Sequence, residues 1–193
     1  DVPLRDARTG AVRRTVETDR AEEDVLPLLE LQAGAARVFA AAAHTLGDPR
    51  FGERARQALA VAQLHLPSER GGWRLSTSPA DAGRVFVEAN GRAIQAHLRA
   101  AVVLEDPSLA ERAVDALEHL VAQAYRPAAG MAHVLDASPR VMGLLGDQVA
   151  MAETLLDAGE LTGRTAYVDL ALELMRSATR RLWDEPAGAF RDT

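Results

Sequence analysis

The chain contains no cysteine and no lysine among its 193 residues. Without cysteine it can form neither disulfides nor thiolate metal sites, and it has no cysteine nucleophile. All 22 basic side chains are arginine, which excludes Schiff-base chemistry through a lysine amine. Because proteins of oxidising compartments often carry disulfides, the lack of cysteine favours a cytoplasmic location, and we expect that location.

Long hydrophobic runs and an excess of positive charge are also missing. No run of about eighteen apolar residues is present, so we expect no membrane span. The net charge of −6 argues against nucleic acid and anionic membrane as main partners. Phosphate-binding, nucleophile-elbow and zinc-protease motifs are absent, and no residues show metal-ligand spacing. We therefore expect no cofactor and no metal.

An internal repeat organises the rest of the chain. Shifting the sequence against itself by 58 positions aligns three glycines: Gly72, Gly130 and Gly188. The same shift aligns the pairs Asp48-Pro49 and Asp106-Pro107, and an acidic set of Glu53, Glu111 and Asp169. We call each set of positions 58 residues apart a repeat column. Such a period indicates repeated supersecondary units.

Each unit is predicted to form a helix, a short turn, a second helix and a long loop. The first helices are expected near 26–46, 87–104 and 145–162, and the second helices near 50–66, 108–125 and 166–183. Asp followed by Pro is a helix start, with Asp as the N-cap and Pro at the first helical position. The predicted fold class is all-α, with tandem αα-hairpins in residues 25–193 after a charged linker or arm at 1–24.

The long loops, 67–86 and 126–143, come just before first helices. They therefore gather at one end of the hairpins, together with the N-termini of those helices. Functional residues concentrate in such loops, and helix N-termini supply free N–H groups and positive potential. We expect any site at this end.

Four stretches resemble a known family. They are GGWRLSTSPADAG (71–83), EANGRAIQAHLRAA (88–101), GLLGDQVAMAETLLDAGELTGRTAYVDLALEL (143–174) and WDEPAGAFRDT (183–193). In this order they resemble the toroid region of thioredoxin-domain-containing proteins, the family that includes spermatogenesis-associated protein 20. More distantly, the hairpins are similar to the (α/α)6 toroids of N-acylglucosamine 2-epimerases and six-hairpin glycosidases. The resemblance implies part of such a toroid, and a sugar-type small molecule as ligand.

The chain also departs from that family. It has no CxxC motif and no thioredoxin-like segment, and Ala89 stands where many members have an aromatic residue before Asn. A closed toroid needs six hairpins, whereas this chain has three. The resemblance therefore implies a fragment of a longer protein, or a partner that completes the ring; the remainder of the toroid or a thioredoxin-like domain would be that partner.

Three residues are candidates for catalysis. Asp147 lies at the start of the first helix expected near 145–162, and Glu88 at the start of the one expected near 87–104. His133 lies in the long loop 126–143. Two carboxylates on neighbouring helices suit glycoside hydrolysis, and a loop histidine suits proton transfer in an epimerase. The alternatives are that both acids complement helix dipoles and that His133 braces its loop.

Four further residues are candidates for ligand binding. Asn90 and Gln148 share a repeat column with Gln32, which equally indicates structural hydrogen bonding along the inner wall. Trp73 is expected either to stack on a sugar ring or to act as a wedge between hairpins. Asp81 lies in the first long loop.

Three functions remain open from sequence. The first is a carbohydrate-active or epimerase-like enzyme, although the low aromatic content of 4% is unusual for a sugar-binding toroid. The second is a non-catalytic toroid module of a thioredoxin-domain protein. The third is a helical-repeat scaffold whose concave face binds a peptide. Neither the substrate nor the oligomeric state follows from the sequence.

Overall fold

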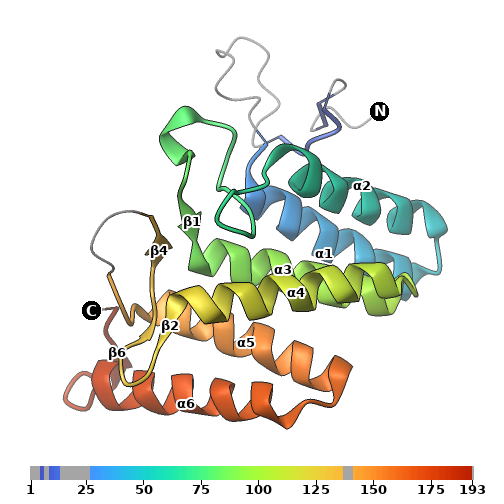
Figure 1. Cartoon of the computed structure of the whole chain (residues 1–193). Helices are drawn as coiled ribbons and strands as arrows, with labels where there is room; N and C mark the ends of the chain where they lie inside the picture. Colours follow the sequence, from blue (N-terminus) through green and yellow to red (C-terminus); the bar gives the residue numbers. More distant parts are fainter. Residues whose placement is uncertain (1–4, 7–8, 14–26, 137–140, 193) are drawn as a thin grey trace.

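Three helical hairpins stand side by side in the computed structural model, which describes residues 5–6, 9–13, 27–136 and 141–192. The six helices are α1 (Leu29–Leu46), α2 (Pro49–His65), α3 (Val87–Val103), α4 (Pro107–Ala124), α5 (Leu145–Thr162) and α6 (Thr165–Leu182). These bounds confirm the predicted all-α fold class and the order of its hairpins (Figure 1).

The first helix of each hairpin belongs to an inner layer. Helix α3 packs between α1 and α5, and each inner helix packs against the second helix of its own hairpin. Alanines such as Ala36, Ala93 and Ala96 are buried on these inner helices, and their small side chains let neighbouring helices approach closely. Helix α3 is accordingly buried on nearly every side.

The Asp-Pro pairs start the second helices as predicted. The side chain of Asp48 accepts a hydrogen bond from the backbone N–H of Arg50, and Asp106 accepts one from Ser108. Pro49 and Pro107 follow at the first helical position, where a missing N–H costs no hydrogen bond.

Short antiparallel strand pairs lie in the long loops at the other end. They are β1 (Val85–Phe86) with β4 (Val134–Leu135), β2 (Tyr125–Arg126) with β3 (Gly130–Met131), and β5 (Trp183–Asp184) with β6 (Ala189–Phe190). A 3₁₀ turn, η2 (Pro79–Asp81), lies in the first long loop. The pairing of β1 with β4 joins two successive loops beside the N-terminal end of α3.

The amide repeat column anchors these loops to the inner helices. The side chain of Asn90 accepts from the backbone N–H of Trp73 and donates to its carbonyl, both at 2.8 Å. Gln148 binds the N–H and carbonyl of Met131 in the same way. The structural role expected for the amides is therefore confirmed.

The repeated glycines make room for these amides. Gly72 has φ +68°, and a Cβ there would lie 2.5 Å from Asn90 Oδ1. Gly130 has φ +83°, and a Cβ there would lie as close to Gln148 Oε1. Only glycine combines the left-handed backbone with this approach, which explains why glycine and amide recur together 18 positions apart.

Part of the segment expected to be a charged arm packs against α1. Gln32 accepts from the N–H of Val12 and donates to its carbonyl, both at 3.0 Å, so it repeats the amide contact of the other two hairpins. Ala11 is buried, and Asp6 forms an ion pair with Arg13. Residues 1–4, 7–8 and 14–24 lie outside the described residues.

Replacing Asn90 by Ala tests the amide anchor. The substitution leaves the buried N–H and carbonyl of Trp73 without partners, so we expect the free energy of unfolding to fall by about 2–4 kcal/mol. Chemical denaturation followed by circular dichroism measures the loss. Gln57→Ala, at an exposed amide of α2, is the matched control and should change stability by less than about 0.5 kcal/mol. Equal effects of the two substitutions would contradict the anchoring role.

Candidate functional site

Asp147 is a buried carboxylate between two inner helices. It lies in the first turn of α5, and 1% of its surface is exposed. One oxygen, Oδ1, accepts a hydrogen bond from the backbone N–H of Glu88 at 3.1 Å. That N–H belongs to the first turn of α3, where N–H groups have no partner within the helix. Asp147 therefore caps the neighbouring helix α3.

The other oxygen of Asp147 faces His133. The distance from His133 Nδ1 to Asp147 Oδ2 is 3.0 Å, and 37% of the histidine side chain is exposed. Two backbone hydrogen bonds hold His133 in its loop. Its carbonyl oxygen accepts from the N–H of Val87, and its N–H donates to the carbonyl of Val141. Phe86 packs edge-on against the imidazole with ring centroids 5.6 Å apart. A buried carboxylate that orients a half-exposed histidine is thus assembled from two separate segments.

Burial raises the pKa of Asp147 from its ordinary value of 3.8 to about 6. The attraction and hydrogen bond of His133 and the N–H of Glu88 act in the opposite direction, and the negative charge of Glu88 adds to the rise. Burial is the largest cause because the charged form loses its hydration. The carboxylate therefore changes its protonation state close to neutral pH.

Glu88 lies beside this pair but forms an ion pair with Arg92. Its Oε1 accepts from both Nε and Nη2 of Arg92, one helical turn later, at 3.1 and 2.8 Å. Its carboxylate also passes close to Gly146, where a Cβ would lie 2.7 Å from Oε2. Glu88 is therefore next to the Asp147–His133 pair, held by Arg92 and partly exposed.

The four predicted ligand-binding residues occupy structural places. The amide groups of Asn90 and Gln148 form hydrogen bonds with the loop backbone at Trp73 and Met131. Trp73 is nearly buried and stacks on the buried ring of His97, with centroids 5.0 Å apart. Asp81 accepts a hydrogen bond from Ser76 at 2.5 Å within its own loop. These contacts hold the four side chains in the fold, and their role in ligand binding stays a prediction.

Sequence reasoning missed two arginines and one aromatic residue near the site. Arg92 was signalled by its spacing of four residues from Glu88, which is an ion-pair spacing on a helix. Phe86 and Arg84 carried no sequence signal. The guanidinium of Arg84 lies over the Phe86 ring, 4.8 Å from its centroid, and Phe86 in turn touches His133.

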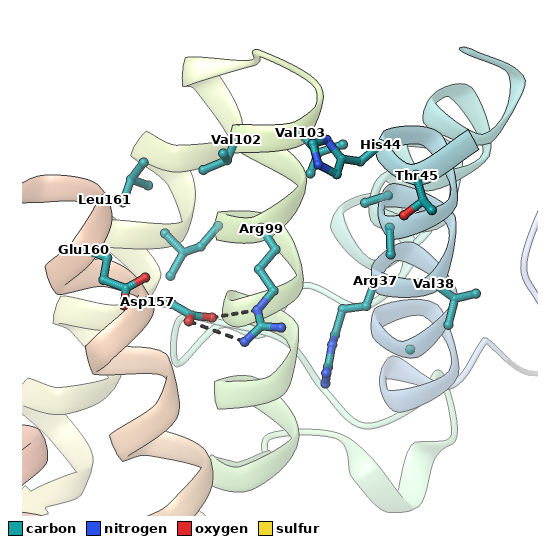
Figure 2. A pocket seen from close by; sticks show the side chains of 14 residues that line it. Arg37, Val38, His44, Thr45, Arg99, Val102, Val103, Asp157, Glu160 and Leu161 are labelled. Atoms are coloured by element: carbon teal, nitrogen blue, oxygen red, sulfur yellow. Dashed lines mark hydrogen bonds and ion pairs between the residues drawn. The ribbon is translucent and has the colours of Figure 1, made fainter. Parts of the chain in front are cut away.

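A cavity of about 950 Å³ lies elsewhere on the inner helices, lined by residues of α1, α3 and α5 (Figure 2). On α3 and α5 its lining residues belong to the C-terminal halves, away from Asp147 in the first turn of α5. Arg99 donates to Asp157 across this face at 2.9 Å, and Arg37 of α1 lies beside them. Apolar side chains such as Val38 and Leu161 complete the wall.

The part of the chain that the structure describes contains no group of three or more His, Cys, Asp or Glu side chains that could hold a metal ion. None of the described helices has the length and apolar character needed to span a bilayer.

Comparison with solved structures identifies the fold. A sugar epimerase from a ruminal bacterium matches with a TM-score of 0.81 and 15% identity, over 98% of this chain and 54% of that one. Cellobiose 2-epimerase from Bacillus thermoamylovorans matches with a TM-score of 0.84 and 12% identity, over 97% and 53%. The glycoside hydrolase family 76 mannosidase Bt3792 from Bacteroides thetaiotaomicron matches with a TM-score of 0.76 and 13% identity, over 96% and 51%.

At these identities the likeness shows the fold alone. The three hairpins form part of an (α/α)6 toroid, and the chain spans about half the length of the solved structures it matches. No protein-family model matches the chain, and no curated protein matches its sequence.

Asp147→Asn tests the raised pKa of the buried carboxyl. Because its folded pKa of about 6 exceeds the ordinary 3.8, the folded state binds the proton more tightly than the unfolded state. The stabilisation is complete below pH 3.8 and is lost as pH rises through about 6. From pH 4 to pH 7 we expect wild-type unfolding free energy to fall relative to that of the Asn variant, by up to about 3 kcal/mol.

Urea denaturation at several pH values measures this difference. The Asn variant serves as the reference for wild type, because every carboxylate other than that of Asp147 titrates in both. Two stability curves that run parallel between pH 4 and pH 7 would contradict the shifted pKa.

Proposed function

We propose that this chain is the half of a carbohydrate-active toroid that carries a proton-transfer dyad, with His133 as the acid–base group and Asp147 as its positioning residue. The observation that carries the proposal is the contact between the buried carboxylate and the half-exposed imidazole, 3.0 Å apart. It lies at the loop-bearing end of the inner helices, where we expected a site. An imidazole held by a carboxylate is an arrangement suited to proton transfer near neutral pH.

The hydrogen bond sets which nitrogen can react. With a proton on Nδ1, His133 donates to Asp147 Oδ2, and its Nε2 lone pair can accept a proton from a substrate. Within the described part of the chain, Nε2 makes no hydrogen bond to protein. Asp147 stabilises the imidazolium that results, because its negative charge lies beside the ring.

The substrate class proposed is an aldose sugar in its open-chain form. His133 would take the proton from the carbon next to the aldehyde, and a second acid on the opposite face, supplied by the remaining hairpins of the toroid, would return a proton and so invert that carbon. Two observations support this choice over glycoside hydrolysis. Glu88 is tied to Arg92 rather than poised as a second acid, and two of the matching folds are sugar epimerases by name.

A non-catalytic module is the second candidate. Its support is that Asp147 caps α3 and that Asn90 and Gln148 anchor loops, so most predicted site residues also hold the fold together. For the origin of the chain, we propose the toroid region of a thioredoxin-domain-containing protein, on the stretches that resemble that family. The remaining hairpins of the toroid are then its partner in the whole protein.

Solvent-deuterium exchange tests the proposed proton transfer. In D₂O the chain should introduce deuterium at C2 of an aldose such as cellobiose or mannose, observed by proton NMR. His133→Ala should lower the exchange rate by about 10²–10⁴-fold, because a positioned acid–base group contributes that much. Asp147→Asn should lower it through loss of orientation and of charge beside the ring.

His44→Ala is the matched control. His44 is an exposed histidine at the far end of α1, so its loss should leave exchange unchanged. A thermal melt of each variant separates lost chemistry from lost folding. If wild type introduces no deuterium into any aldose, the proposed proton transfer by this chain fails and the non-catalytic module is favoured.

A further inference from the structure

Arg84 is a cation without an ionic partner at the margin of the Asp147–His133 pair. It directly precedes β1, and its guanidinium lies over the Phe86 ring, 4.8 Å from the centroid. The residue is half-buried, yet its guanidinium forms no hydrogen bond or ion pair with the described part of the chain. Partial burial removes hydration from this charge, and no described carboxylate compensates for the loss. A ligand with a negative group would do so.

Phe86 links Arg84 to His133. The guanidinium lies over the phenyl ring, and the imidazole packs against the same ring at 76° with centroids 5.6 Å apart. Strand β1 also pairs with β4, which begins directly after His133, so both sides of the contact belong to one strand pair (Figure 1). The cation–π contact restrains the guanidinium without using its N–H groups, which remain in its plane for a ligand. Arg84 is thus held one aromatic ring away from the imidazole.

Acids in the same loop, in the first turn of α3 and beside β4 do not pair with Arg84. Glu88 accepts from Nη2 of Arg92 at 2.8 Å, and Asp81 accepts a side-chain hydrogen bond within its own loop. Asp136 follows β4 at the same end of the strand pair, but it forms no ion pair with Arg84. The positive charge of Arg84 is therefore left for a bound molecule.

We propose that Arg84 determines substrate specificity at this site by binding an anionic group of the sugar, a carboxylate or a phosphate. The inference rests on the proposed function, because it concerns the aldose that His133 deprotonates. A guanidinium donates two parallel hydrogen bonds to either oxyanion, and such charge-assisted bonds are stronger than those to the hydroxyl oxygens of a neutral sugar. The preferred substrate class is therefore a uronic acid or an aldose phosphate.

The spacing of the three groups suits a sugar of six carbons. The contacts of Arg84 and His133 with the shared ring of Phe86 keep the guanidinium and the imidazole within reach of one open-chain molecule. With the carbon next to the aldehyde at the imidazole, the opposite end of the chain extends to the guanidinium. That end carries the carboxylate of a uronic acid and the phosphate of an aldose 6-phosphate.

Deuterium exchange into matched aldoses is the first test. Glucose, glucuronic acid and glucose 6-phosphate differ at the terminal carbon, and the two anions distinguish a carboxylate site from a phosphate site. Wild type should show a kcat/KM for one of the anions about ten- to hundred-fold above that for glucose, because hydrogen bonds to charged groups contribute that much. Arg84→Gln should remove the preference by slowing exchange into the anion alone. Arg84→Lys should keep part of it, since the charge remains but the paired donors are lost.

Arg54→Gln is the matched control. Arg54 is also half-buried, and it lies in the second turn of α2, at the end of the hairpins away from β1. Its loss removes the same charge and should leave the preference for the anion unchanged. The ratio between anionic and neutral aldoses is the readout, because a disturbed Phe86 would slow exchange into all three sugars together. Circular dichroism of each variant checks that it is folded.

Binding of sugar alcohols separates this inference from the proton transfer. Sorbitol, sorbitol 6-phosphate and gulonate have no aldehyde, so calorimetric titration measures their binding without any reaction. If they bind with a preference for the anion that Arg84→Gln abolishes, while no aldose exchanges deuterium, the anion site stands and the proton transfer fails. Equal exchange into neutral and anionic aldoses, or a preference that survives Arg84→Gln, overturns the anion site and leaves the proton transfer standing. If neither exchange nor Arg84-dependent binding is observed, both proposals fail.

Discussion

The contact on which the site depends is the two-point hydrogen bond from an amide side chain to loop backbone. Gln148 holds the N–H and carbonyl of Met131, and Gly130 makes that approach possible. Asp147 precedes Gln148 on the helix, and His133 comes two residues after Met131 in the loop. The amide that anchors the loop therefore also brings the imidazole to the carboxylate.

The same contact explains why the repeat is visible in sequence. A loop that must present its backbone to an amide requires glycine in a left-handed conformation beside it, so glycine and amide recur together at Gly72 with Asn90 and at Gly130 with Gln148. Such constraints act within one unit and recur with its period. The helices, the Asp-Pro starts and the common end of the loops were predictable for that reason.

What the sequence could not supply are relations between units. Asp147 was expected to complement its own helix, whereas its oxygen accepts from the first turn of α3. The edge-on packing of Phe86 on His133 and the place of Val12 on Gln32 join residues far apart in the chain, and no local pattern encodes them. The cavity walls on α1, α3 and α5 likewise arise only when three helices are set side by side.

Asp147 itself argues for more than a structural role. A neutral amide or hydroxyl could accept the same N–H of Glu88 without the desolvation that raises the pKa of the buried carboxyl to about 6. The repeat column of Asp147 holds Leu31 and Ala89, so the other two hairpins are built without any polar side chain at this position. An ionisable group is thus present in one hairpin of three, although burial disfavours its charged form. It also contacts a half-exposed histidine. That combination is the reason for proposing proton transfer in addition to helix capping.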